Sequence, residues 1–274
     1  MMKIAVAIAT EDALPSAFVV FRGLEQSIRK AADLGYDGVE LALMHKEQVN
    51  MSLIKKIYKE YGMEIVAVST GQVFAGLNLY FTHPDPTLRE KALEVFRGLI
   101  NLASEFGAMV NIGRVRGPII ESEKKEIVEK RFIDVMNNLS EYSASRGIKL
   151  LIEPVNRYEI NFINTLDEGA DIIRRIEHKN VYLMADTFHM NIEDDSIPAS
   201  LARNIAYTAY VHFADSNRLA PGRGHLNFPE IVHTLKSLGY NGWISVEILP
   251  VPDPDTAALE AIRYLRALIP RKGV

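Results

Sequence analysis

Residues 150–159 read LLIEPVNRYE, a short apolar run that ends in a carboxylate and is followed at once by proline. The run has the length and composition of a buried strand. Glu153 then stands at the carboxyl end of this strand, and a second carboxylate, Glu159, follows six residues later. In a barrel of parallel strands such an end is where function is concentrated.

Seven other apolar runs resemble this one, and longer amphipathic segments separate them. They begin at Lys3, Gly38, Glu64, Ala108, Val181, Ala209 and Trp243. The continuous apolar character of these runs favours parallel strands that are buried on both faces. Eight strand-then-helix units in 274 residues predict an α/β protein with a (β/α)8 TIM barrel, in a single domain that spans residues 1–274.

Helix boundaries are marked along the chain. Asp85-Pro86 is typical of a helix start, and glycines stand where helices should end, at positions 35, 62, 107, 147 and 239. A doubly wound open sheet is the alternative fold. The sequence has no G-x-G-x-x-G after the first strand and no G-x-x-x-x-G-K-[ST], so the commonest nucleotide-binding forms of that fold are not supported.

The composition limits the partners. The chain has 31 Lys and Arg against 35 Asp and Glu, a formal charge of −4 and no cysteine. A large nucleic-acid surface is not expected without a basic stripe, and no apolar run approaches membrane length. The N-terminus lacks a cleavage pattern, so we expect a cytoplasmic protein that acts on a small molecule. Any metal must be held by oxygen and imidazole ligands.

Four consecutive strands end in residues that can bind a metal, namely Glu153, Asp186, His212 and Glu247. Each alone has an ordinary explanation: a glutamate paired with an arginine such as Arg157, a loop-capping aspartate, or a core histidine. Together, three carboxylates in one barrel mouth would repel one another, and a divalent cation relieves that repulsion. Oxygen-rich ligation favours Mn²⁺, with Mg²⁺ or Co²⁺ as alternatives.

Several of these motifs resemble those of a known family. The segments are GYDGVE at 35–40, EPVNRYE at 153–159, DTFH at 186–189, HFADSNR at 212–218, PGRGH at 221–225 and SVE at 245–247. They are similar to the ketose 3-epimerases, the tagatose and psicose group within the xylose isomerase-like barrels.

The resemblance implies the site and the reaction. The metal ligands are Glu153, Asp186, His212 and Glu247, and the substrate-binding residues are Glu159, His189 and Arg218. The implied reaction inverts C3 of a free ketose through a cis-enediolate. Glu153 and Glu247 serve as the acid/base pair. The family also implies a homo-oligomer, a dimer or a tetramer.

One segment departs from the family. Residues 111–117 read NIGRVRG, where ketohexose enzymes of the group have small or apolar residues. Arginine pairs well with carboxylates, so Arg114 and Arg116 are candidate contacts for a substrate carboxylate. An acidic keto sugar such as 5-keto-gluconate is then a substrate class beside tagatose and psicose. The other interpretation places one of the two arginines on a solvated loop, paired with a nearby glutamate.

Other functions are compatible with the same residues. An aldose–ketose isomerase or a keto-inositol dehydratase on this barrel would use the same metal. A metal-dependent endonuclease acting at abasic sites shares the barrel type, but it needs more histidine ligands and a basic face. A barrel that binds metal and catalyses nothing is the fourth reading.

Overall fold

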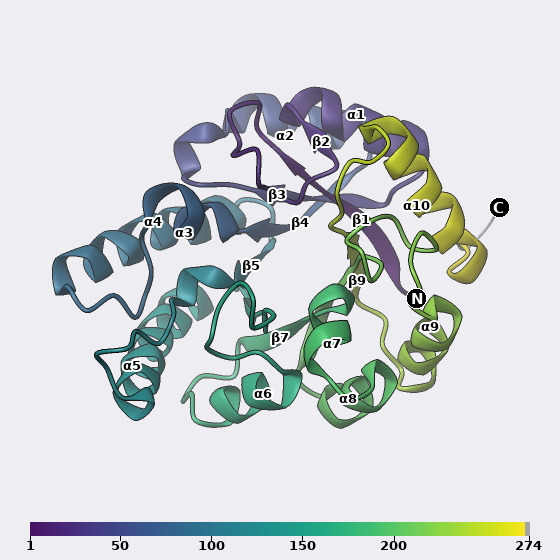
Figure 1. The fold of residues 1–274 in the computed structure, drawn as a ribbon. Coiled ribbons are helices and arrows are strands. Elements are labelled where there is room, and N and C mark those ends of the chain that lie inside the picture. Colours follow the sequence, from purple (N-terminus) through teal and green to yellow (C-terminus); the bar gives the residue numbers. More distant parts are fainter. Residues whose placement is uncertain (272–274) are drawn as a thin grey trace.

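The structure is a computed structural model that describes residues 1–271, and its strands form a closed ring (Figure 1). All neighbouring strands are parallel, and the last strand pairs with the first. The ring follows chain order through β1 (Lys3–Ala9), β3 (Gly38–Ala42), β4 (Glu64–Ser69), β5 (Met109–Ile112), β6 (Leu150–Ile152), β7 (Val181–Asp186), β8 (Thr208–Phe213) and β9 (Trp243–Val246). The predicted (β/α)8 TIM barrel is confirmed. The predicted domain also includes residues 272–274, which lie outside the described part.

Helices surround this ring (Figure 1). They are α1 (Leu24–Leu34), α2 (Met51–Glu60), α3 (Gly71–Leu77), α4 (Pro86–Ser104), α5 (Lys125–Ala144), α6 (Leu166–Arg174), α7 (Thr187–Glu193), α8 (Ile197–Asn204), α9 (Phe228–Ser237) and α10 (Pro254–Leu268). The short elements β2 (Phe21–Arg22), η1 (Lys46–Gln48) and η2 (Arg114–Arg116) lie in the connections. β2 pairs with the carboxyl end of β1.

Side chains with the expected chemistry begin and end the helices. Asp85 accepts a hydrogen bond from the backbone N–H of Thr87 and is followed by Pro86, so the predicted start of α4 is confirmed. Gly35 ends α1 in the left-handed conformation, with φ of 92°. A side chain is strained at such an angle, which explains the glycine.

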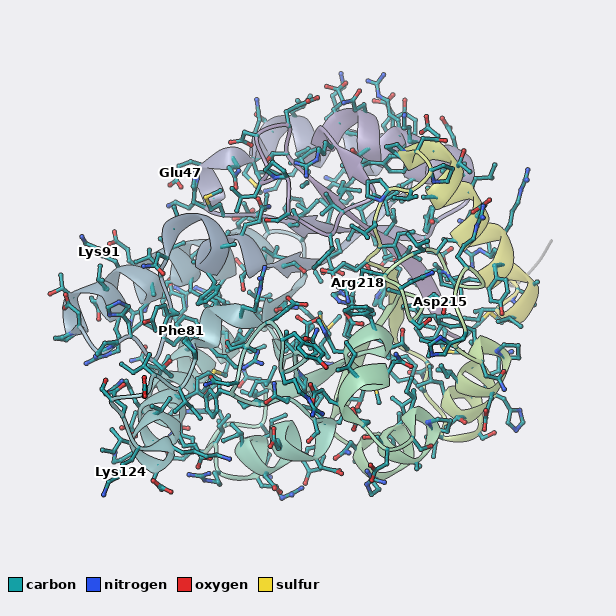
Figure 2. The ribbon with its side chains drawn as sticks, in the orientation of Figure 1. Glu47, Phe81, Lys91, Lys124, Asp215 and Arg218 are labelled. Atoms are coloured by element: carbon teal, nitrogen blue, oxygen red, sulfur yellow. The ribbon has the colours of Figure 1, made fainter. Side chains whose placement is uncertain are left out.

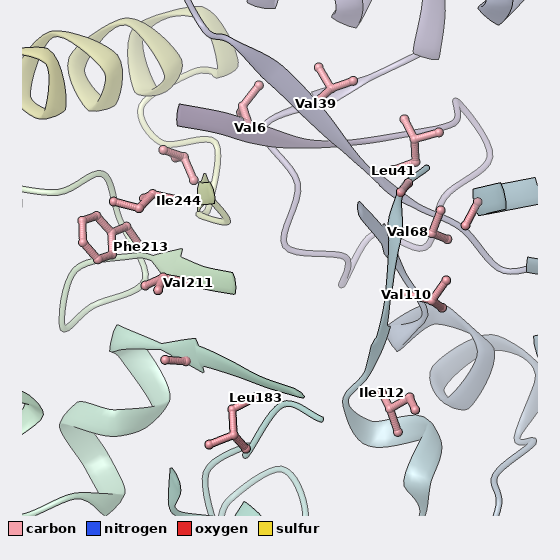
Figure 3. Close-up of a cluster of buried hydrophobic side chains, with 14 of the residues drawn as sticks. Val6, Val39, Leu41, Val68, Val110, Ile112, Leu183, Val211, Phe213 and Ile244 are labelled. Atoms are coloured by element: carbon pink, nitrogen blue, oxygen red, sulfur yellow. The ribbon is translucent and has the colours of Figure 1, made fainter. Parts of the chain in front are cut away.

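The strands have two different faces. On the outer face a large apolar core packs against the helices, and Figure 3 shows several of its side chains directed away from the barrel interior. Full burial of each such side chain stabilises the fold by about 1.5–3 kcal/mol. A smaller apolar cluster fills the interior, with Ala5, Val66, Ala67, Leu151, Met184 and Tyr210.

The interior cluster supports a polar layer above it. Side chains of a strand alternate between its faces, so a residue two positions further on shares the face of the first. Glu153 therefore follows Leu151, Asp186 follows Met184 and His212 follows Tyr210 on the inner face. Asp186 is paired with His212 in register, and His212 with Ser245. The fold thus places these polar residues side by side, directly above the apolar cluster of the barrel interior.

Candidate metal centre and substrate pocket

Four side chains meet at the carboxyl end of the barrel. Ligand atoms of Glu153, Asp186, His212 and Glu247 all lie within 4.8 Å of one another. Nδ1 of His212 is 3.3 Å from Oε1 of Glu153, 3.6 Å from Oδ2 of Asp186 and 3.5 Å from Oε2 of Glu247. The structure therefore brings together the four residues that were predicted as metal ligands.

A buried glutamate orients His212 from behind. Oε2 of Glu40 lies 2.9 Å from Nε2 of His212 and accepts a hydrogen bond of 2.9 Å from the hydroxyl of Tyr210. The hydroxyl of Ser69 also donates to Glu40, whose side chain is fully buried. Since the carboxylate of Glu40 accepts a hydrogen bond from Nε2–H, the lone pair of Nδ1 is directed at the other three ligands.

Glu40 was not predicted as a site residue. It lies within a buried strand, GVELA, whose apolar character hides its role. Its position on the inner face could have been read from the two-residue period of that strand.

The site favours positive charge at its centre. Burial alone would lower the pKa of His212, but the charges of Glu40 and Glu247 raise it well above its usual value. Nδ1 is buried and, among residues 1–271, has no hydrogen-bond partner. Three carboxylates and one imidazole with a free lone pair suit a divalent cation. The cluster could hold such a metal ion.

The three carboxylates differ in their environments. Burial would raise the pKa of Glu153, but the close contact with His212 and the charge of that ring hold it below its usual value. Burial would likewise raise the pKa of Asp186, which Arg218 holds far below its usual range. For Glu247, burial and the charges of Glu153 and Asp186 raise the pKa to about 8, against the pull of His212 and Arg218.

Arg218 holds two of the ligands. Its Nη1 donates to Oδ2 of Asp186 at 2.8 Å, and its Nη2 donates to Glu247. The guanidinium lies between the rings of Phe18 and Phe188, 4.6 and 4.8 Å from their centroids. Arg218 has a left-handed backbone with φ of 62°, a conformation that costs a non-glycine residue about 1–3 kcal/mol and that clusters at functional sites. Figure 2 shows it near the middle of the ring of helices.

A pocket of about 630 Å³, measured with its open mouth, lies over the carboxylates. Its polar lining includes Asn111, Arg114, Glu153, Glu159, His189, Arg218 and Glu247. Its apolar lining includes Leu14, Ala17, Phe18, Val19, Ala42 and Ala75. All three residues predicted to bind substrate, Glu159, His189 and Arg218, line this pocket.

Asn111 is another residue that the sequence analysis missed. Its Nδ2 donates to Oε2 of Glu153 at 2.8 Å, and its side chain is buried. It stands on the inner face of β5, in a strand that has no other signal of function. The bond fixes one oxygen of Glu153 and leaves the other, Oε1, beside His212.

The two arginines of the NIGRVRG segment have different positions. Arg114 lines the pocket, 3.6 Å from Glu159. Arg116 is fully buried, and its guanidinium donates to the backbone carbonyls of Gly113, Glu153, Phe162 and Ile163. The predicted contact of Arg116 with a substrate carboxylate is therefore corrected: its donors are already used by the loop that it braces. Arg114 alone stays a candidate for that contact.

None of the helices within residues 1–271 has the length and apolar character that a membrane span requires.

Comparison with known proteins relates this architecture to sugar enzymes. The model of the xylose isomerase-like TIM barrel family matches residues 28–268. An L-ribulose 3-epimerase of Methylomonas sp. is 31% identical over 82% of this chain and 78% of its own. A 3-dehydro-D-guloside 4-epimerase of Escherichia coli is 26% identical over 88% of this chain and 93% of its own.

A solved structure of a sugar epimerase has the same fold as this chain. The D-psicose 3-epimerase of Clostridium cellulolyticum H10, crystallised with D-tagatose, superposes with a TM-score of 0.82 at 25% identity, over 98% of this chain and 99% of that one. The predicted resemblance to ketose 3-epimerases is thus confirmed, as is the expectation of an enzyme of the isomerase class. Because the family model covers most of its length, this chain belongs to the xylose isomerase-like TIM barrel family.

Proposed function

We propose that the protein is a metal-dependent epimerase that inverts C3 of a free ketose or keto sugar acid through a cis-enediolate. The observation that carries this proposal is the pair of carboxylates, Glu153 after β6 and Glu247 after β9, which both line one pocket. Between them in strand order lie Asp186 and His212. The names of the curated relatives support the same reaction.

The chemistry needs two groups on opposite faces of one carbon. Glu153 takes the C3 proton as a base, the C–H electron pair becomes the C2–C3 double bond, and the carbonyl pair moves to O2. Glu247 then gives a proton to C3 from the other face, and the carbonyl forms again. Both glutamates return to their first protonation states by exchange with water. A bound divalent cation would polarise the ketone and neutralise the developing charge on oxygen.

The surrounding residues hold the reacting groups in place. Asn111 fixes Glu153, and Arg218 fixes Glu247. Glu159 and His189, with Arg218, would bind the O1 to O3 end of the sugar so that C3 lies between the two carboxylates. Small misplacements of the reacting carbon are costly, since most of the rate depends on this orientation. We propose Mn²⁺ as the metal, with Mg²⁺ or Co²⁺ as alternatives, because the donors are mostly oxygens.

The substrate class depends on Arg114. Its ion pair with Glu159 is long, at 3.6 Å, and its guanidinium lies 5.9 Å from the ring centroid of Phe74. A carboxylate at the far end of a keto sugar acid, such as 5-keto-gluconate, could pair with it. Tagatose and psicose have no carboxylate, so with these substrates Arg114 would stay paired with Glu159. Arg114→Met should raise KM for the acid at least about tenfold and leave KM for the neutral ketose nearly unchanged.

A second candidate is epimerisation at C4 of a 3-keto sugar, which one relative supports by its name. The metal site and both glutamates would serve equally well there, because C4 is also next to the ketone. Isomerase and dehydratase chemistry stay alternatives for the same reason.

One experiment separates these reactions. The protein is stripped of metal, reloaded with Mg²⁺ and incubated in D₂O with a panel of ketoses, 3-keto sugars and keto-gluconates, and deuterium is located by NMR. We expect deuterium at C3 of a 2-ketose, and only with metal. Deuterium at C4 indicates the second candidate, deuterium at C1 or C2 an isomerase, and loss of water a dehydratase.

Glu247→Gln tests the two-carboxylate scheme in the same assay. It should abolish inversion at C3 while leaving the circular dichroism spectrum unchanged; Glu153 alone can still exchange the C3 proton with retention of configuration. Glu121→Gln, at an exposed glutamate, is the matched control and should invert C3 normally. Inversion at the wild-type rate by Glu247→Gln would refute the scheme.

The homo-oligomeric state, a dimer or tetramer, and the cytoplasmic location stay predictions.

A further inference from the structure

The loop after β6 contains a buried asparagine between two pocket residues. Asn156 is 2% exposed. Its Nδ2 donates to Oε1 of Glu159 at 3.0 Å and lies 2.8 Å from Nδ1 of His189. Its Oδ1 accepts a hydrogen bond of 3.0 Å from the backbone N–H of Tyr158. One amide group thus contacts both a carboxylate and an imidazole of the pocket.

The hydrogen-bond partners of the Asn156 amide determine which of its two end atoms is oxygen and which is nitrogen. A backbone N–H can only donate, so the atom beside Tyr158 must be the amide oxygen. A carboxylate can only accept, so the atom beside Glu159 must be the amide nitrogen. The second hydrogen of that nitrogen is directed at His189, and the backbone N–H of Asn156 also points to its Nδ1, at 3.4 Å. Nδ1 is therefore an acceptor in both contacts.

We propose that Asn156 is a positioning residue that keeps His189 in the neutral tautomer with its proton on Nε2. His189 then offers an N–H donor to the pocket, because Nε2 is the ring nitrogen that Asn156 leaves free. The ionic contact of Nε2 with Asp186 is 3.8 Å, too long for a hydrogen bond, so this donor is available to a substrate oxygen. Which substrate oxygen accepts this hydrogen bond rests on the proposed function. The assignment of the tautomer is independent of that function.

The same amide fixes a second group at once. Asn156 also holds Glu159 by a hydrogen bond. It therefore positions two neighbouring groups of the pocket wall, the carboxylate of Glu159 as an acceptor and the Nε2–H of His189 as a donor. A protonated Nδ1 would face an N–H group with no acceptor, so the contact disfavours the imidazolium as well as the other tautomer.

The test reads the tautomer directly. Protein with ¹⁵N-labelled histidine is loaded with Mg²⁺, and the ring nitrogens are observed through their long-range couplings to ring hydrogens. His189→Gln identifies the signals of His189. We expect an N–H type shift for Nε2 and a lone-pair type shift for Nδ1. The opposite assignment, or two N–H type shifts, would overturn the proposal.

Two variants separate a tautomer effect from general loosening of the loop. Asn156→Asp puts an oxygen where the amide nitrogen was, so His189 should gain a proton on Nδ1. Asn164→Asp is the matched control: Asn164 braces the same loop through the carbonyls of Val155 and Ile160, and no contact joins it to His189. His189 should keep its proton on Nε2 in this control. Unchanged shifts in Asn156→Asp, or equal changes in both variants, would refute the assignment.

Activity gives an independent reading with D-psicose as the probe. Asn156→Asp should lower kcat/KM at least about tenfold, because the tautomer with its proton on Nδ1 leaves Nε2 of His189 without the N–H that a substrate oxygen would accept. If the wild type exchanges no proton of any sugar, the proposed function fails, and the NMR result still decides the role of Asn156.

Discussion

At the scale of single residues, Asp194 is a partly buried carboxyl whose hydrogen bonding is incomplete. Oδ1 accepts from the hydroxyl of Ser200 at 2.5 Å, whereas Oδ2 is buried and has no partner within residues 1–271. Burial raises the pKa of Asp194 to about 6. The unfolded chain has the ordinary, lower pKa, so between about pH 4 and 6 the native state binds the proton more tightly. The free energy of unfolding therefore falls as pH rises through this range.

Replacing Asp194 tests this sign. The free energy of unfolding of Asp194→Asn, minus that of the wild type, should be larger at pH 7.5 than at pH 4.5 by on the order of 2 kcal/mol. Urea unfolding at the two pH values measures this difference. Asp195→Asn removes the same charge at an exposed neighbour and should show no such difference between the two pH values. A difference that is equal for both variants would contradict the buried position of Asp194.

Metal-binding side chains at or near the ends of strands, His212 included, could be predicted from the sequence, whereas the supporting residues Glu40 and Asn111 could not. Glu153 and Asp186 are charged residues at the ends of apolar runs, and this change from apolar to charged can be recognised in the sequence alone. Glu40 and Asn111 act through contacts with residues far along the chain, 172 positions apart for Glu40 and His212. Arg116 was placed wrongly for the same reason, because its carbonyl partners belong to a loop whose path only the folded chain defines.

At the scale of elements, that loop is held by Arg116. Its guanidinium joins η2 to the segment after β6, through the carbonyl of Glu153 and those of Phe162 and Ile163. Burial lowers the pKa of Arg116 to about 9, against the charge of Glu153, so nearby carboxylates and these carbonyl contacts together stabilise the buried cation. The loop carries Asn156 and Glu159, and its shape therefore sets part of the pocket.

Arg116→Met should destabilise the protein by about 3–5 kcal/mol, because it leaves buried carbonyls without donors. Arg114→Met makes the same change two residues away, at a side chain that is partly exposed and lines the pocket, and should cost about 1 kcal/mol or less. Urea unfolding of both variants measures the difference. Equal losses would show that the buried hydrogen bonds of Arg116 contribute little.

Most regular elements followed from sequence periodicity, including the eight strands. The exceptions are short. α3 and α7 have seven residues each and directly follow the strand ends, and β2 has two. Elements this short do not fold on local preference alone. Their contacts with the barrel stabilise them, so their sequences carry little signal.

At the scale of the whole molecule, closure of the barrel gathers three carboxylates in its interior. In the unfolded chain these groups are far apart and solvated, so only the folded chain brings their charges together. A cation that binds the folded state alone raises the free energy of unfolding by about 2.7 kcal/mol at a hundred times its Kd. For a chain of this size that corresponds to a rise in Tm of about 5 °C or more.

Calorimetry of chelator-treated protein with and without Mn²⁺ measures this rise. His212→Gln should lose it, whereas Glu121→Gln, at an exposed glutamate, should keep it. The rise should also depend on pH: the pKa of Glu247 is raised to about 8, so below this pH a proton competes with the cation. At fixed Mn²⁺ the rise in Tm should therefore be smaller at pH 6 than at pH 8. A rise that His212→Gln retains in full would place the metal elsewhere and remove the main support for the proposed chemistry.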